Sequence, residues 1–117
     1  MKLQRVFAVI ATADLDRAER FYTALTGRAP DDRPMDGLLQ WRGPDAAGLQ
    51  VVLDLSKAGN SMATLIVPDM STARAALRSA GLTLGPDIHA DQSTIAQIDD
   101  PDGNRLTLAE PPRIAAG

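Results

Sequence analysis

Short apolar runs and amphipathic stretches follow one another along this chain, and they predict its elements. The run over 6–11 is uniformly apolar. After it, apolar side chains recur every three or four residues, at Leu15, Ala18, Phe21, Tyr22 and Leu25. That interval places them on one face of a helix. Asp14 or Asp16 suits the start of this helix, and Gly27 follows its expected end.

The same pattern returns in the second half of the chain. Asp14 corresponds to Asp69, 55 residues further along, and Ala18 corresponds to Ala73. The apolar run at 62–67 precedes the second pattern, and a helix is expected over about 71–80, with Asp69 or Ser71 as its cap. An internal repeat of this kind predicts two copies of one structural unit.

Shorter segments with the composition of strands follow each predicted helix. They cover 38–42, 49–55, 83–88, 94–98 and 105–109. Two prolines and three aspartates between 28 and 37 predict a loop with at most one weak edge strand. A turn is expected at 100–104, because Pro101 sets φ early and Gly103 and Asn104 accept a positive φ.

This order predicts an α+β fold of two β-α-β-β-β modules. The modules should form a strongly curved, mixed, mostly antiparallel sheet with the helices on the outside. At 117 residues the chain is expected to be one domain, with modules at about 1–58 and 59–112 and a flexible tail at 113–117.

Composition excludes several classes of partner and site. The 12 basic and 15 acidic residues are scattered, whereas a nucleic-acid surface needs a basic patch. The absence of cysteine excludes disulfides, zinc–thiolate sites, iron–sulfur clusters and thiol nucleophiles. The apolar run at 6–11 is far shorter than the ~20 residues that span a bilayer, and it lacks the features of a secretory signal. We expect a cytoplasmic protein with no nucleic-acid or membrane partner.

Two segments resemble the vicinal oxygen chelate superfamily, which includes glyoxalase I, extradiol dioxygenases, fosfomycin-resistance transferases and bleomycin-resistance proteins. They are Ala-Asp-Leu-Asp-Arg-Ala-Glu-Arg-Phe-Tyr at 13–22, followed by Leu-Thr-Gly at 25–27, and Asp-Pro-Asp-Gly-Asn-Arg-Leu-Thr-Leu at 100–108. The resemblance covers nearly the whole chain as two paired modules. It implies the superfamily's fold, but one fold hosts many functions.

The resemblance also implies where a metal would bind. Enzymes of this superfamily hold a divalent ion with a His on the first strand, a His on the strand that opens the second module, and a Glu on the last strand. Those positions fall on Phe7, Met62 and Thr107, none of which suits a Mn, Fe, Ni or Zn ion. Some of these enzymes add a Glu from the fourth strand, which is predicted here at 49–55. Asp54 is the only acid on that strand, and one carboxylate does not make a metal site. We expect no metal, no cofactor and no catalytic residue of that type.

A cavity for a small molecule is the alternative use of these positions. If the sheet has the superfamily's geometry, alternation along its strands directs eight side chains toward the concave face. These candidate ligand-binding residues are Phe7, Val9, Leu39, Trp41, Met62, Thr64, Gln97 and Thr107. An apolar lining with a few polar groups is typical of small-molecule sites. Phe7 and Met62 could instead fill the space and leave no cavity.

Other polar residues carry weaker signals. The single histidine, His89, lies between Asp87 and Asp91. It could belong to a small metal cluster, act as a general base supported by a carboxylate, or be a solvated residue of a polar loop. The solvated interpretation is favoured. Asp99, Asp100 and Asp102 crowd one turn without the spaced ligands of a calcium loop, which favours a turn-forming role.

Three functions follow from these observations. We favour a metal-free protein, similar to the bleomycin-resistance branch, that sequesters or senses an apolar or aromatic small molecule. The alternative is a metal-dependent lyase, transferase or dioxygenase of the glyoxalase type, and a third possibility is a protein that only dimerises. A homodimer is expected, because superfamily members commonly pair modules across a two-fold axis and each sheet leaves edges to cover.

Overall fold

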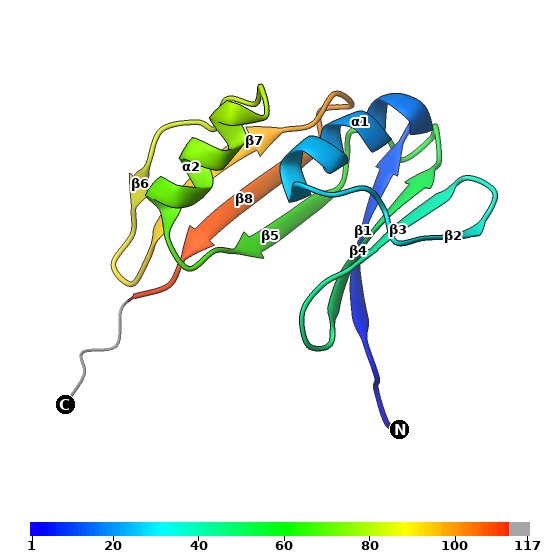
Figure 1. Cartoon of the computed structure of the whole chain (residues 1–117), viewed down its shortest axis with the longest axis horizontal. Coiled ribbons are helices and arrows are strands. Elements are labelled where there is room, and N and C mark those ends of the chain that lie inside the picture. The colour runs from blue at the N-terminus through cyan, green and yellow to red at the C-terminus, as the bar shows by residue number, and fades with distance from the viewer. Residues whose placement is uncertain (113–117) are drawn as a thin grey trace.

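The computed structural model in Figure 1 describes residues 1–112, so the tail expected at 113–117 lies outside the described residues. Module 1, as we name it, contains β1 (Val6–Thr12), α1 (Leu15–Thr26), β2 (Asp32–Met35), β3 (Leu38–Arg42) and β4 (Ala47–Leu53). Module 2 contains β5 (Met62–Ile66), α2 (Met70–Ser79), β6 (Ile88–His89), β7 (Thr94–Asp99) and β8 (Arg105–Glu110). The predicted α+β class with two β-α-β-β-β modules is confirmed.

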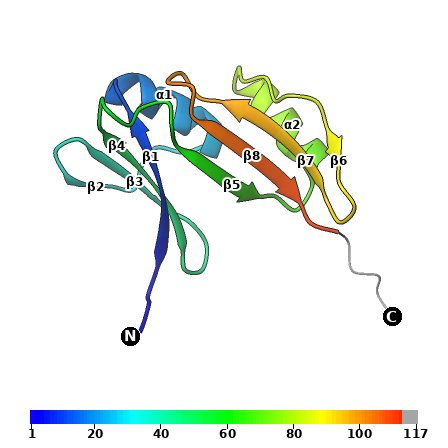
Figure 2. The ribbon, with the colours of Figure 1, turned by 180° about the vertical axis from the view of Figure 1, so that it is seen from behind.

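The strands form two four-stranded sheets, in the orders β1-β4-β3-β2 and β5-β8-β7-β6. The first strand of each module pairs in parallel with the last, and the other neighbours are antiparallel. The single sheet expected from the sequence is therefore divided in two. The division follows from the path of β1 and β5, which approach each other at one end and diverge along their length (Figure 2). At the close end, the Ala11 amide donates to Ser61 Oγ at 2.9 Å.

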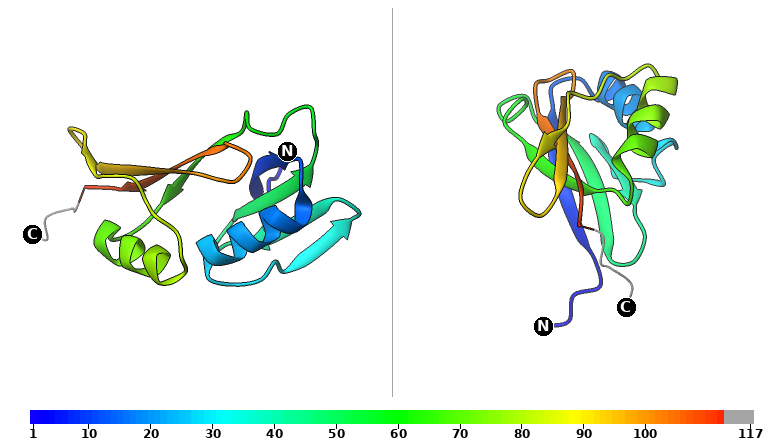
Figure 3. Two further views of the ribbon diagram at one scale, coloured as in Figure 1. Left: turned by 90° about the horizontal axis from the view of Figure 1, so that it is seen from above. Right: turned by 90° about the vertical axis from the view of Figure 1, so that its left-hand side faces the viewer.

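One face of each sheet is covered by the helix of its own module, and both helices lie on the same side of the molecule (Figure 3). In module 1 the register places Ile10, Val51 and Leu39 side by side on three strands, where they are buried with Phe21 and Tyr22 of α1. In module 2 the buried side chains of β7 and β8 belong to the same core as Met70 and Leu77 of α2; they are Ala96, Ile98, Leu106 and Leu108. We call the opposite side of each sheet its helix-free face.

The two helices begin at equivalent aspartates, but they are capped differently. Asp14 accepts a hydrogen bond from the Arg17 amide at 3.1 Å, as an N-cap should, and Gly27 ends α1 with φ of 78°. Asp69 makes no such bond to the backbone and instead accepts from the hydroxyls of Ser71 and Thr72. Within the part of the chain that the structure describes, neither helix is long and apolar enough to cross a bilayer.

The strand expected at 83–88 is wrong, since only Ile88 and His89 form the short β6. Gly85 donates one backbone hydrogen bond to the Gln97 carbonyl, at 2.8 Å, and Pro86 has no amide proton with which to continue a ladder. Leu84 is buried in the core, so the apolar pattern there reflects packing of a loop. The strand expected at 49–55 ends at Leu53, because the next residues turn back on themselves.

Candidate functional site

The helix-free face of module 1 carries Phe7 and Val9, as the alternation predicts. Their neighbours across the parallel pairing with β4 are Gly48 and Gln50. The Phe7 ring lies directly over Gly48, where an added Cβ atom would be only 2.4 Å from a ring carbon. Glycine at this position therefore makes room for the half-buried aromatic ring. Val9 has no such cover and is 53% exposed.

The helix-free face of module 2 carries four further predicted residues. Thr64, Thr107 and Gln97 lie side by side on β5, β8 and β7, and Met62 precedes them on β5. Gln97 Nε2 donates a hydrogen bond to Thr107 Oγ1 at 3.2 Å. Met62 is 80% exposed. The polar row of this face lies between Met62, whose β8 neighbour is Arg105, and Ile66, whose β8 neighbour is Ala109.

The placement of Leu39 and Trp41 on this side of the molecule was wrong. Both face α1 and are almost fully buried, and the Trp41 ring centroid lies 6.2 Å from that of Tyr22. Trp41 Nε1 donates to the Arg28 carbonyl at 2.9 Å. Alternation predicts two faces for a strand but does not say which one meets the helix, and a shift of one residue exchanges them. Gln40 takes the helix-free side of β3 instead and accepts a hydrogen bond from Gln50 at 2.8 Å.

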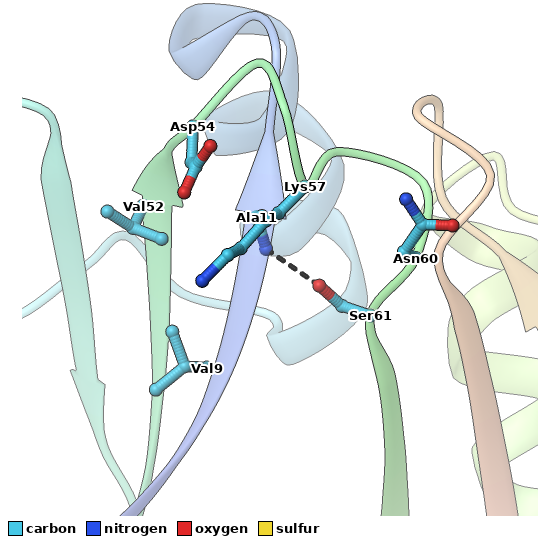
Figure 4. Close-up of a pocket in the computed structure, with 7 residues that line it drawn as sticks. All are labelled: Val9, Ala11, Val52, Asp54, Lys57, Asn60 and Ser61. Atoms are coloured by element: carbon cyan, nitrogen blue, oxygen red, sulfur yellow. Dashed lines mark hydrogen bonds between the residues drawn. The ribbon is translucent and has the colours of Figure 1, made fainter.

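A pocket of about 270 Å³ lies beside the helix-free face of module 1, at the end where the linker to module 2 begins (Figure 4). It is lined by Val9, Ala11, Val52, Asp54, Lys57, Asn60 and Ser61. The apolar residues come from β1 and β4, and the polar ones come from the linker that joins the two modules. Only Val9 was predicted to contact a ligand. The linker was missed because its polar residues form no periodic pattern that would bring them over a sheet.

The linker is held in place by hydrogen bonds of its own. The Asp54 carbonyl accepts from the amides of Lys57 and Ala58, at 3.3 and 3.1 Å, so the chain turns immediately after β4. Asp54 Oδ1 accepts from both the amide and the hydroxyl of Ser56, at 3.1 and 2.8 Å. The Ser56 hydroxyl is the main reason that the pKa of Asp54 lies below its ordinary value. The carboxylate is therefore ionised at neutral pH.

The turn at 100–104 joins the two modules beside this pocket. Asp100 is buried, and its Oδ1 accepts from the amides of Asp102 and Asn104, each at 2.9 Å. Its Oδ2 accepts from the Tyr22 hydroxyl of α1 at 2.7 Å. Burial, and then this hydrogen bond, raise the pKa of Tyr22. Asn104 Nδ2 donates to the Ala11 carbonyl at 2.7 Å.

Asp102 completes the connection between the modules. It accepts from the Thr12 hydroxyl, from the Ala13 amide at 3.0 Å and from Arg17 at 3.0 Å. Burial alone would raise the pKa of Asp102, but the Thr12 hydroxyl and the other donors hold it below its ordinary value. The crowded aspartates are thus a structural turn, as the sequence favoured.

The residues present do not fit the metal that the superfamily's enzymes bind. The strand neighbours of Phe7 and Met62 are Gly48 and Arg105, and Thr107 pairs with Thr64, so no imidazole or carboxylate stands at these positions. Within residues 1–112, no three His, Asp or Glu side chains gather into a possible metal site.

The alternative of a metal cluster at His89 has no support in the geometry. His89 is exposed and pairs with Thr94 at the end of β6. Asp87, one of its two possible partners, forms an ion pair with Arg74 at 2.5 Å. This carboxylate therefore stabilises the loop after α2.

Comparison with protein families identifies the fold that carries this site. The family model described as a glyoxalase-like domain matches residues 7–109, nearly the whole chain. The chain belongs to the glyoxalase-like domain family. No curated protein matches this glyoxalase-like chain significantly. The resemblance to the vicinal oxygen chelate superfamily is confirmed by this match and by the solved structures that follow.

Three solved structures share the fold of the glyoxalase-like chain. A glyoxalase/bleomycin resistance protein from Catenulispora acidiphila DSM 44928 is 27% identical, with a TM-score of 0.87 over 95% of this chain and 100% of its own. An antibiotic-binding protein from Streptomyces sp. CB03234 is 22% identical, with a TM-score of 0.75 over 95% and 96% of the two chains. A bleomycin-binding protein, solved with bleomycin, is 19% identical, with a TM-score of 0.75 over 91% and 97%.

Proposed function

We propose that this glyoxalase-like chain is a metal-free protein that binds an apolar or aromatic small molecule, in order to sequester or sense it. The observation that carries the proposal is the set of apolar side chains left uncovered on the helix-free faces. Val9, Met62 and Ile66 are 53%, 80% and 69% exposed. Covering these side chains with a ligand or a second chain would remove apolar surface from water, which is favourable.

Six of the predicted residues are proposed to contact the ligand, two on the helix-free face of module 1 and four on that of module 2. They are Phe7, Val9, Met62, Thr64, Gln97 and Thr107. Apolar side chains with a few hydrogen-bonding groups are what small-molecule sites offer, and the Gln97–Thr107 pair supplies such groups. The similar structures that bind bleomycin or another antibiotic support this choice of ligand class.

The direct test adds bleomycin, and separately the dye 8-anilinonaphthalene-1-sulfonate, and measures the melting temperature and the dissociation constant. We expect at least one of them to stabilise the protein by mass action. Met62→Glu should then weaken its binding about tenfold, because a carboxylate would be desolvated on the ligand surface. Ala75→Glu places the same charge on the exposed side of α2 and should leave binding unchanged. Failure of both compounds to stabilise the protein would contradict the proposed ligand class.

The metal-free part of the proposal rests on Phe7, Met62 and Thr107, which offer no suitable ligand set. Elemental analysis of protein purified without chelator should find no stoichiometric divalent ion. Adding Mn, Ni or Zn should leave the melting temperature unchanged, since only an ion that binds the native state stabilises it. A saturable increase with any of the three would favour the metal-dependent alternative.

The proposed assembly is a homodimer. The uncovered apolar side chains and the edges of two short sheets are what a second copy would cover. Sedimentation velocity at roughly tens of micromolar protein should show a dimer, because interfaces of standard size are usually tighter than that. A monomer at this concentration would contradict the proposal.

A further inference from the structure

The pocket at the junction of the modules has two chemically different walls. Val9, Ala11 and Val52 form an apolar wall from two paired strands, while Asp54 and Lys57 belong to the linker over it (Figure 4). At about 270 Å³ the pocket lies just below the ~300–1,000 Å³ of sites for drug-sized molecules. A short aliphatic chain suits a pocket of this volume.

The charge of Lys57 contributes to the lowered pKa of Asp54, but the two groups form no ion pair with each other. Within the described residues, Lys57 takes part in no side-chain hydrogen bond, and neither it nor Asp54 belongs to any of the ion pairs there. Asp54 Oδ1 is occupied by Ser56, whereas Oδ2 has no partner in that part of the structure. The Lys57 side chain extends across the opening (Figure 4), so the pocket presents a cation and an anion beside an apolar wall.

The carboxylate of this pair is held in place, and the lysine lies close to it along the chain. Asp54 and Lys57 stand three residues apart on one hydrogen-bonded turn, and Ser56 orients the carboxylate. Below the pocket, Ser61 binds the Ala11 amide at 2.9 Å and anchors the far end of the linker to β1. A ligand that satisfied both charges would be oriented before its apolar part met Val9 and Val52.

We infer that this pocket binds a small zwitterion of the α-amino acid type, with its ammonium group on Asp54, its carboxylate on Lys57 and an aliphatic side chain on Val9 and Val52. The inference goes beyond the proposed function: the pocket shares only Val9 with the proposed ligand surface, and it would bind a second class of ligand. Charge-assisted hydrogen bonds of this kind are stronger and more directional than neutral ones. A compound with only one of the two charges leaves the other group of the protein without a partner.

The test uses three compounds with the same side chain: L-leucine, N-acetyl-L-leucine, which lacks the ammonium, and L-leucinamide, which lacks the carboxylate. Binding is followed by two-dimensional amide NMR of the full chain. Leucine should bind about tenfold more tightly than either relative, as expected for one additional bond to a charged group. The shifted amides should include those of Ala11, Asp54, Lys57 and Ser61.

Two substitutions assign each charge to its partner. Asp54→Asn keeps the Oδ1 acceptor for Ser56 but removes the charge, so it should weaken leucine about tenfold and leave N-acetyl-L-leucine unchanged. Lys57→Gln should weaken leucine equally and leave L-leucinamide unchanged. Asp91→Asn and Lys2→Gln are the matched controls, because both residues are exposed and neither lines the pocket. Lys2 is the only other lysine of the chain.

Several results would overturn the inference. They are equal affinity for the three compounds, insensitivity of leucine to both substitutions, and shifted amides that lie outside the pocket. The outcome can be separated from that of the proposed function, which is tested with bleomycin, the dye and Met62→Glu. If bleomycin or the dye binds and leucine does not, only the amino-acid ligand is rejected. If leucine binds selectively and neither bleomycin nor the dye binds, the apolar ligand class is rejected and the inference about this pocket stands.

Discussion

The two modules have the same topology, yet the equivalent turns that join their last two strands do different things. In module 1 the turn at 43–46 contacts its own module, where Gly43 donates to the Ala47 carbonyl at 2.9 Å and Val6 donates to the Ala46 carbonyl at 2.8 Å. In module 2 the turn at 100–104 reaches across to α1 and the end of β1. A repeated fold therefore need not repeat its contacts, and one turn supplies most of the polar connection between the modules.

The cores of the modules differ as well. The rings of Phe21 and Tyr22 pack edge to face at 5.0 Å between centroids, and Trp41 adjoins them, all in module 1. The buried core residues of module 2 are aliphatic, with Met70. Tyr22 belongs to the aromatic cluster and also binds Asp100, so module 1 offers a rigid platform and module 2 provides the turn that docks on it.

The largest effect should come from breaking the aromatic core of module 1. Trp41→Ala should lower the free energy of unfolding by about 4 kcal/mol, because it leaves a cavity and removes one of the two side-chain hydrogen bonds that the Arg28 carbonyl accepts. The aliphatic counterpart in module 2, Leu77→Ala, should cost about 3 kcal/mol. Both are measured by urea denaturation. A loss of less than about 1 kcal/mol for Trp41→Ala would contradict the buried position of Trp41 and favour the predicted position on the ligand surface.

The next effect compares the two turns directly. Asp100→Ala should lower the free energy of unfolding by about 3 kcal/mol, since it leaves the Tyr22 hydroxyl and the Asn104 amide buried without their acceptor. Asp45→Asn in the equivalent turn of module 1 should change it by less than about 0.5 kcal/mol, because Asn tolerates the positive φ of 57° found there. Equal losses in the two turns would remove the distinction drawn between them.

A smaller difference is expected between the two helix starts. Asp14→Ala removes a true N-cap bond to Arg17 and should cost about 1 kcal/mol. Asp69→Ala removes only contacts with the hydroxyls of Ser71 and Thr72, so it should cost less than half of that. Thermal denaturation of the two variants under identical conditions tests the order. If the Asp69 variant were the less stable, the capping roles would be reversed.

The smallest effect concerns the dependence of stability on pH. Because the folded pKa of Asp102 is depressed, its stabilising contribution is present above the unfolded-state pKa of about 3.9 and is lost as pH falls through the folded value. Asp102→Asn should therefore be less stable than wild type at pH 7, and the difference should shrink at pH 3. Urea denaturation at both pH values measures it. A difference that stays constant would show that the charge of Asp102 does not stabilise the connection between the modules.

The sequence by itself determined the features that depend on local patterns. The spacing of apolar residues and the aspartates at 14 and 69 predicted both helices nearly to their ends. The repeat predicted equivalent strands at β1 and β5, and the two motifs predicted the superfamily. These features are local because capping, helical periodicity and turn chemistry act over a few residues. The assignment of the superfamily's metal-ligand positions to Phe7, Met62 and Thr107 likewise needed only positions along the chain.

The tertiary structure alone decided which face of β3 meets the helix, that the modules form two sheets, and that a polar linker covers an apolar wall. Alternation along β3 is equally satisfied by either face, and only the packing of Trp41 against Tyr22 selects one. Asp54 and Lys57 reach Val9 because a turn after β4 folds the linker back over the sheet. Contacts between residues so far apart in the chain depend on how whole strands and turns are placed, and no local pattern encodes that placement.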